Sequence, residues 1–493
     1  MNFTKSKYQQ DIENVVLKTD KNILVNAKAG SGKSTTLKMI AKTIDPKLKT
    51  AFVAFNKKIV EELREDLPKN IECTTLHSKG FQIVRGSLVN SKKCVLNNYK
   101  INDLIKDASK SWGLEEMFDD KQEQRSYCDR VRELCNLARL FLTKNNEELE
   151  LVAEKYDILI SNGEVSKCFK ILKTAGQMRT KIDFTDMIYH AVRYGKLTEI
   201  QKYDVIFIDE CQDLNKCQLA LVRKLLKKDG RFIAVGDPAQ SIYGFAGADK
   251  KSFQSFMDIE NTIEMPLNEC YRCGKNIIKY AQNIVPEIEA FSGNEDGEVD
   301  LAASLDMIKA NDFVMCRNTL PLIETFYILI KKQIPAFIVG KDIGENICKI
   351  IKDTKRIGLD PLFNELDKQL EKVALKLAKK FPDLNESEVK QKFAYINFKE
   401  VVAILEMMRS ADKTIKNAED LRSRVVEMFA QKEDSVMLSS IHRAKGLEAD
   451  RCFIIRPDLM PSKYAKQPWE KIQEKNLEYV AYTRAKKYLG IVY

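Results

Sequence analysis

The stretch NILVNAKAGSGKST covers residues 22–35 and decides the fold class of the first half of the chain. It begins with a short apolar run of the kind that forms a buried parallel strand. A glycine-containing turn follows, and apolar residues then recur at helical spacing at Leu37 and Ile40. A strand, a glycine-rich turn and a helix start together direct backbone N–H groups toward phosphate oxygens. The stretch therefore predicts a nucleotide-binding loop formed by Ala29, Gly30, Ser31, Gly32, Lys33, Ser34 and Thr35.

An acidic pair later in the chain completes the chemistry that such a loop needs. In this loop pattern the lysine, here Lys33, reaches the β- and γ-phosphates, and the hydroxyl of Ser34 binds Mg²⁺. The apolar run DVIFI at residues 204–208 leads directly into DECQD. We expect Asp209 to hold the metal through water and Glu210 to act as general base on the attacking water. An acidic helix start is the structural alternative for this pair, but its combination with the loop favours the catalytic interpretation.

Strand-like runs recur in both halves of the chain, and two long stretches interrupt them. The interrupting stretches, residues 87–180 and 346–430, have apolar residues at helical spacing and are too long to be loops inside a compact domain. We therefore expect two α/β domains with parallel sheets, each split by a helical insert. The expected strands are residues 22–26, 50–55, 204–208 and 231–235 in the first half, and 312–316, 336–339, 435–439, 451–455 and 488–493 in the second.

Composition restricts the class of protein. The 493 residues carry a net charge of +10 with neutral histidines, and 44% of them are hydrophobic, close to the value for globular chains. This composition excludes a disordered tail protein, a collagen and a disulfide-stapled mini-protein. We find no membrane-length apolar stretch and no signal core, so we expect a cytoplasmic protein without a membrane partner. The twelve cysteines are interpreted as reduced, mostly buried thiols, because Cys270 and Cys273 lack a second pair to complete a zinc site.

DECQD resembles the DExQD box of superfamily 1 DNA helicases of the UvrD/Rep type. The other boxes of that family are recognisable in the same order along almost the whole chain, and nothing resembles a nuclease domain. The matching segments are KYQQDI, AFNKKIVEEL (54–63), TTLHSKG (74–80), GDPAQSIYGFAGA (236–248), NECYRC (268–273), SSIHRAKGLEAD (439–450) and VAYTRAKK (480–487).

The resemblance implies a domain organisation. Both α/β domains would be RecA-like P-loop domains, and hydrolysis would occur where they face each other. The second insert is short for the family, which puts contacts between that element and duplex DNA in doubt. The expected segments are 1–86 and 181–265 for the first domain with insert 87–180, and 266–345 and 431–493 for the second domain with insert 346–430.

The resemblance also implies roles for residues around the nucleotide. Gln9 would read the adenine, with Gln10 as a competing assignment, and Tyr271 would stack on the base. Gln240 would contact the γ-phosphate. Glu448 would contact the ribose and line the strand side of the cleft. Two arginine fingers, Arg272 and Arg484, would neutralise charge on the transferred phosphoryl group.

A second set of residues resembles the family's strand-contacting positions. Single-strand binding without sequence preference needs rings for bases to stack on and a basic groove for the backbone. Core packing is the structural alternative for each aromatic ring, and a structural role is expected for His190. The implied DNA-binding residues are Phe55, Tyr243 and Phe245 as stacking rings, with Lys58, His77 and His442 beside them.

The function that we expect is an ATP- and Mg²⁺-dependent translocase on single-stranded DNA that unwinds duplex DNA. Its 3′-to-5′ polarity follows from the resemblance alone. The expected partners are single strands, single-strand/duplex junctions and a further protein. We expect a monomer or weak oligomer, and the protein class is one that bacteria and phages encode. Two alternatives stay open: a DNA-stimulated ATPase that remodels or regulates complexes in repair, phage propagation or defence, and an RNA motor.

Overall fold

The computed structural model describes residues 5–54, 57–86, 94–118, 121–156, 158, 160, 163–244, 251–380, 385–390, 393–431 and 433–493. It divides into two compact units, Met1–Glu269 and Cys270–Tyr493. We expected the second domain to begin at residue 266, but strand β8 (Thr262–Leu267) belongs to the first sheet. None of the helices in the described part of the chain has both the length and the apolar character that a membrane crossing requires.

The first unit is built on a six-stranded sheet in the order β3-β2-β6-β7-β1-β8, and all its strand pairs are parallel. Because the strands are parallel, their carboxyl ends meet at one edge of the sheet. The segments that follow β1, β6 and β7, namely the glycine-rich loop, DECQD and the segment starting GDPAQ, are therefore neighbours. The strands are β1 (Asn22–Ala27), β2 (Thr50–Ala54), β3 (Ile71–Thr75), β6 (Tyr203–Ile208), β7 (Leu226–Gly236) and β8.

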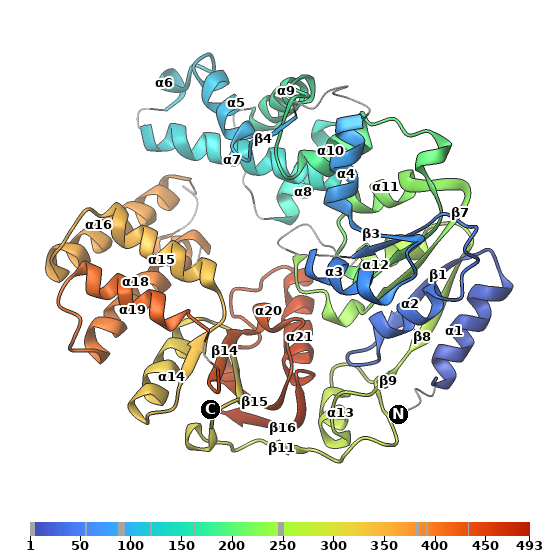
Figure 1. Cartoon of the computed structure of the whole chain (residues 1–493). Helices are drawn as coiled ribbons and strands as arrows, with labels where there is room; N and C mark the ends of the chain where they lie inside the picture. The colour runs from blue at the N-terminus through green and yellow to red at the C-terminus, as the bar shows by residue number, and fades with distance from the viewer. Residues whose placement is uncertain are drawn as a thin grey trace. The chain divides into compact units, whose positions relative to one another are not determined.

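Helices cover both faces of this sheet (Figure 1). Alternate residues of each strand enter different cores: Ile23 and Val25 pack on one face, and Leu24 on the other. This alternation follows from the two-residue repeat of a strand and explains why the runs are apolar throughout. The helices are α1 (Lys7–Lys18), α2 (Lys33–Ala41) and α3 (Lys57–Asp66) against the first core, and α4 (Leu76–Val84), α10 (Asp186–Arg193), α11 (Lys216–Leu225) and α12 (Lys251–Met257) against the second.

The first insert has a hydrophobic core of its own. Tyr127, Val131 and Leu134 lie one helical turn apart and are completely buried in it, together with residues of the neighbouring helices. In Figure 1 the helices α5, α6, α7 and α9 gather into a bundle. Its elements are β4 (Val95–Leu96), α5 (Lys100–Ser109), α6 (Leu114–Met117), α7 (Lys121–Phe141), α8 (Asn146–Lys155), α9 (Glu164–Gln177) and β5 (Lys181–Ile182).

The second unit contains another six-stranded parallel sheet, in the order β11-β16-β15-β12-β14-β13. Its strands are β11 (Glu298–Asp300), β12 (Phe313–Cys316), β13 (Ala336–Ile338), β14 (Val436–Ser440), β15 (Ala449–Ile455) and β16 (Ala485–Val492). The helices beside them are α13 (Lys275–Ala281), α14 (Leu320–Lys331), α20 (Ile441–Ala444) and α21 (Pro468–Tyr482), and a short pair, β9 (Glu269–Cys270) and β10 (Glu289–Ala290), precedes the sheet.

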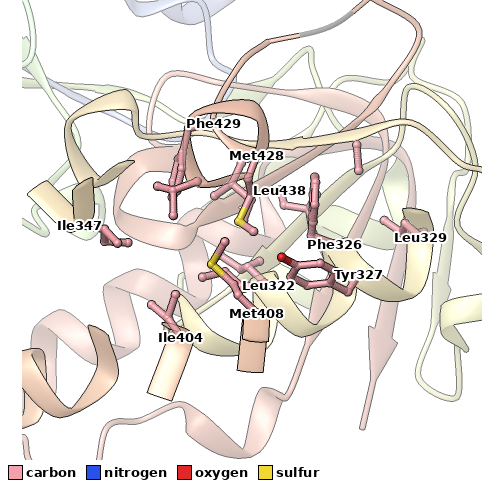
Figure 2. Close-up of a cluster of buried hydrophobic side chains, with 14 of the residues drawn as sticks. Leu322, Phe326, Tyr327, Leu329, Ile347, Ile404, Met408, Met428, Phe429 and Leu438 are labelled. Atoms are coloured by element: carbon pink, nitrogen blue, oxygen red, sulfur yellow. The ribbon is translucent and has the colours of Figure 1, made fainter. Parts of the chain in front are cut away.

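Unlike the first insert, the second shares one core with its sheet. Figure 2 shows this core, in which Ile404 and Met408 of the insert pack with Leu322 and Phe326 of α14 and Leu438 of β14. The helices of the insert are α15 (Lys341–Asp353), α16 (Leu359–Lys380), α17 (Glu386–Val389), α18 (Phe393–Ala411) and α19 (Ala418–Met428). The structure thus confirms the predicted fold class: two α/β domains with parallel sheets, each interrupted by helices.

Candidate functional site

The turn between β1 and α2 has the backbone that phosphate binding requires. Gly30 and Gly32 adopt positive φ angles of 67° and 79°, which side chains rarely tolerate. Gly32 is the N-cap residue of α2 and provides no side-chain cap. The first N–H groups of this nine-residue helix thus lack a side-chain acceptor and are suited to an anion.

Lys33 places a buried positive charge at this turn. Its side chain is 11% exposed, and its Nζ lies 4.0 Å from Oδ2 of Asp237. That separation exceeds hydrogen-bond distance, and Nζ makes no hydrogen bond within the described residues. A buried ammonium group without a hydrogen bond is costly, so the site is suited to an anion that would accept its protons.

Two hard oxygen ligands meet next to Lys33. The Ser34 hydroxyl donates a 2.6 Å hydrogen bond to Oδ2 of Asp209, although the two residues lie 175 positions apart. Burial, helped by the nearby charge of Glu210, raises the pKa of Asp209 to about 6. A hydroxyl and a carboxylate are oxygen ligands of the kind that Mg²⁺ uses in nucleotide sites, where water and phosphate oxygens complete its coordination. The donor set therefore fits the metal expected from the sequence.

A chain of side chains links the acidic pair to Gln240. Glu210 follows β6 with a φ of 52° and accepts a 2.5 Å hydrogen bond from the amide nitrogen of Gln212. The amide oxygen of Gln212 accepts from the backbone N–H of Asp237 at 3.1 Å. Oδ2 of Asp237 in turn accepts from the amide nitrogen of Gln240 at 2.8 Å. Sequence reasoning singled out Glu210 and Gln240 but missed Gln212 and Asp237, although both lie inside the recognised boxes.

Gln9, and not Gln10, lies beside the glycine-rich turn. Gln9 is buried and donates from Nε2 to Oγ1 of Thr36 at 3.1 Å. Its amide oxygen accepts from the backbone N–H of Ser6, which fixes the side chain at the start of α1. Gln10 is exposed and donates to the carbonyl of Lys5. The structure therefore brings together Gln9, Lys33, Ser34, Asp209, Glu210 and Gln240 at one edge of the first sheet.

In the second unit the expected nucleotide-contacting residues form another cluster. Nε of Arg272 lies 2.5 Å from Oε2 of Glu448, whose other oxygen pairs with Lys486 at 2.9 Å. Arg272 also donates to the carbonyl of Thr483 at 3.4 Å. Arg484 is only 2% exposed and donates to the carbonyls of Val480 and Leu447. In this conformation the Arg484 guanidinium therefore binds backbone carbonyls of its own unit. To contact a phosphate, its side chain would have to reorient.

Tyr271 is presented by the same cluster. It is 36% exposed, and its ring centroid lies 4.9 Å from that of Phe291 at a tilt of 44°. Phe291, which sequence reasoning did not identify, therefore positions the ring that is expected to stack on adenine.

The expected strand-contacting residues are only partly described. Phe55 and Phe245 lie outside the described residues, as does the side chain of Lys58. Tyr243 is half-buried beside Gly244, whose carbonyl accepts a 2.8 Å hydrogen bond from Tyr156 of the first insert. His442 lies at the start of α20, and its pKa is lowered to about 4 by burial and by Arg317.

His77 has an aromatic neighbour that sequence reasoning missed. Its ring stacks on Phe184 with centroids 3.9 Å apart and planes inclined by 21°. Burial lowers the pKa of His77 to about 4, so the imidazole is neutral, while Phe184 is 53% exposed. An exposed ring beside a residue expected to contact the strand is the signal that identifies Phe184, and the folded chain is needed to show it.

Comparison with known proteins gives the helicase family that the sequence motifs resemble. A family model described as the UvrD/REP helicase N-terminal domain matches residues 8–259, more than half of the chain, and one described as the UvrD-like helicase C-terminal domain matches residues 435–492. F-box DNA helicase 1 of Gallus gallus is 24% identical over 98% of this chain and 48% of its own length. F-box DNA helicase protein 1 of Schizosaccharomyces pombe is 23% identical over 94% and 55%.

Bacterial relatives match a shorter region. The ATP-dependent DNA helicase PcrA of Bacillus subtilis is 27% identical over 55% of this chain and 38% of its own length. The chain thus spans about half or less of the length of these relatives. Because the N-terminal family model covers most of the first unit and the C-terminal model covers the end of the second, the chain belongs to the UvrD/REP helicase family.

Proposed function

We propose that the protein is an ATP-dependent translocase on single-stranded DNA that couples hydrolysis to duplex unwinding, with 3′-to-5′ polarity. One observation carries the proposal: the buried ammonium of Lys33 makes no hydrogen bond within the described residues and lies beside the Ser34–Asp209 pair. Family membership supports ATP use and DNA as substrate, and the matched relatives are named DNA helicases.

The residues of the first unit divide the chemistry among them. Lys33 and the N–H groups of α2 bind the phosphates. Ser34 and Asp209 would hold Mg²⁺, which would supply positive charge to polarise the terminal phosphoryl group. Glu210 takes the proton of the attacking water. The hydrogen bond that Gln212 donates to Glu210 orients this carboxylate. Gln240 contacts the γ-phosphate, and its hydrogen bond to Asp237 connects it to the same chain of side chains.

The second unit supplies the groups that complete hydrolysis. Tyr271 stacks on the adenine, Glu448 contacts the ribose, and Arg272 and Arg484 neutralise charge in the transition state. Since these groups belong to a different compact unit from Lys33, hydrolysis requires the two units to meet around the nucleotide. Strand movement would follow from that closure and its reversal.

Measured ATP hydrolysis tests the site. We expect Lys33→Ala and Glu210→Gln to lower DNA-stimulated ATPase by at least about 100-fold, because each removes a direct contact to the reacting groups. The matched control is Lys38→Ala, which removes a lysine of the same helix whose Nζ pairs with Asp66 at 2.6 Å on the surface. Stimulated turnover that survives either site substitution would refute the assignment.

Strand separation distinguishes the proposal from a remodelling ATPase. Duplexes with a 3′ tail, a 5′ tail or no tail are offered with ATP, and unwinding of the 3′-tailed substrate alone supports a 3′-to-5′ helicase. ATPase stimulation without unwinding of any substrate would favour the remodelling or regulatory role. Stronger stimulation by RNA than by DNA of equal length would favour an RNA motor.

The setting of this activity is part of the proposal. The proposed partners are single strands, single-strand/duplex junctions and a further protein. We propose a cytoplasmic monomer or weak oligomer.

A further inference from the structure

Two cysteines enclose the residues that are proposed to contact the nucleotide from the second unit. Cys270 ends the short strand β9 and Cys273 precedes α13, so that Tyr271 and Arg272 stand alone between them. Both cysteines are free and buried, with exposures of 0% and 1%. The pair does not join a metal site, because no group of three or more metal-ligating side chains occurs among the described residues.

The ends of this four-residue turn are held in place. The side-chain nitrogen of Asn294 donates to the carbonyl of Cys270 at 2.7 Å and to that of Cys273 at 2.9 Å. The next residue, Gly274, donates from its backbone to the carbonyl of Lys486 at 2.7 Å. One donor that bridges two carbonyls keeps the two cysteines close together, as a tight turn requires.

The two thiols differ in chemical character. The neighbouring Cys273 thiol lowers the pKa of the Cys270 thiol to about 7 despite burial, and the backbone N–H groups of Arg272 and Cys273 contribute in the same direction. The proximity of Cys270, together with burial, raises the pKa of the Cys273 thiol. A thiol that ionises near neutral pH beside a protonated partner is the arrangement in which one sulfur reacts first and the other resolves the product.

Disulfide formation would disturb the proposed nucleotide contacts. A sulfur–sulfur bond of about 2.05 Å is much shorter than any non-bonded contact between two thiols. The Cys273 thiol donates to the carbonyl of Thr483 at 3.6 Å, the same carbonyl that accepts from Arg272 at 3.4 Å, and oxidation removes that donor. Because Asn294 holds the ends of the turn, Tyr271 and Arg272 have to absorb the change in geometry.

We propose that Cys270 and Cys273 form a redox site, in which a disulfide across Tyr271 and Arg272 switches off ATP hydrolysis reversibly. The regulatory part of this inference rests on the proposed function; the disulfide itself does not. With hydrogen peroxide as oxidant, the Cys270 sulfur attacks one peroxide oxygen: an S–O bond forms, the O–O bond breaks, and one water leaves with the thiol proton. The Cys273 sulfur then attacks the sulfenic sulfur, an S–S bond replaces the S–O bond, and a second water leaves.

A peptide map of the full chain tests the disulfide without reference to activity. Trypsin cleaves after Arg272 and therefore separates the two cysteines into peptides 252–272 and 273–275. After treatment with peroxide and blocking of the remaining thiols, we expect these peptides to be recovered as one linked species that dithiothreitol separates. Recovery of both as blocked free thiols, under conditions that oxidise other cysteines of the chain, would overturn the proposal.

ATPase measured on the same samples tests the switch. An arginine finger contributes a factor of about 10³–10⁵, so oxidation should lower stimulated ATPase by about tenfold or more, with recovery in dithiothreitol. Cys270→Ser should keep its ATPase in peroxide. The control Cys168→Ser should remain sensitive, because Cys168 belongs to another buried pair, with Cys135, in the core of the first insert.

The outcomes separate the two proposals. A linked peptide with unchanged ATPase would overturn the switch. A reduced protein without DNA-stimulated ATPase would contradict the proposed function instead, and the peptide map would still decide whether the pair is a redox site. Because recovery in dithiothreitol is measured on the unsubstituted chain, the test holds even if Cys270→Ser does not fold.

Discussion

His77 and Phe184 show how one residue pair can serve both folding and binding. The buried face of the stack anchors the neutral imidazole against the ring, and the other face of Phe184 is left open, with 53% of the residue exposed. Nucleic-acid bases stack on exposed aromatic rings without sequence preference. Residue-scale geometry therefore adds Phe184 to the proposed strand-binding surface.

We expect Phe184→Ala to weaken single-stranded DNA binding. Base–aromatic stacking contributes about 1–3 kcal/mol per base, which corresponds to a factor of about 5 to 150 in Kd. The measurement is fluorescence anisotropy with a labelled oligonucleotide in the absence of ATP. Tyr99→Ala is the matched control, because Tyr99 is a 70% exposed ring of the first insert. Equal affinities for the wild type and Phe184→Ala would mean that the ring serves only to pack His77.

At the scale of elements, a buried ionic network fastens the first insert to its domain. Asp186 at the start of α10 accepts from Lys100 of α5 at 2.7 Å and from Arg139 of α7 at 3.0 Å. Nε2 of His190 lies 3.3 Å from the same carboxylate, and Asp183 takes a second hydrogen bond from Arg139 at 2.6 Å. The network thus joins two helices of the insert to a helix of the α/β domain.

Loss of the central carboxylate should be costly. Asp186→Asn would leave the buried ammonium and guanidinium groups with too little negative charge, which typically costs about 3–5 kcal/mol. We expect a correspondingly lower urea midpoint in a denaturation experiment followed by circular dichroism. Asp129→Asn serves as control, since Asp129 pairs with Arg132 on the exposed side of α7, where such pairs contribute about 0–1 kcal/mol. If the two substitutions cost the same, the network does not stabilise the insert.

Most strands could be predicted from the sequence, because the apolar pattern that indicates a strand lies within a few consecutive residues. The run DVIFI predicted a strand at residues 204–208, and β6 is Tyr203–Ile208. Parallel strands then bring the following boxes to one edge, so Ser34 and Asp209 could be expected together despite their separation in sequence. The Lys100–Asp186 pair and the stack on Phe184 could not be predicted, because each joins residues whose local patterns are ordinary and whose contact depends on how the insert packs.

For the whole molecule, the two inserts differ in how they are attached to their sheets. The first insert has a core separate from those of its sheet, and ionic contacts attach it. Most of the second insert is continuous with its sheet: Met408 and Leu405 belong to the same core as Leu438 of β14, and a small separate cluster forms around Leu377, Val389 and Tyr395. A continuous core resists internal rearrangement, because close-packed side chains transmit displacement rather than absorb it. The part of the insert that shares this core is therefore expected to move and to unfold together with the sheet.

Histidine protonation couples this molecule to pH. The chain has three histidines, and burial is the leading cause that lowers the pKa of His77, His190 and His442 to about 4 each. The three histidines are therefore neutral near pH 7, as the formal net charge of +10 assumes. Each pKa lies below the unfolded value of about 6.5, so between these values the unfolded chain binds more protons than the folded chain.

The free energy of unfolding should consequently fall on acidification. The contribution of a neutral buried histidine is fully present above about pH 6.5 and is lost as pH falls toward 4, with a slope of up to about 1.36 kcal/mol per pH unit and per histidine. In the second unit this applies to His442, so His442→Asn should flatten the decrease in unfolding free energy between pH 7 and pH 5. Urea titrations at pH 7, 6 and 5 measure the slope, with hydrogen exchange of residues 436–440 as the readout for that unit. Identical slopes in the wild type and the variant would show that the imidazole of His442 is accessible to protons in the folded protein, contrary to its burial beside Arg317.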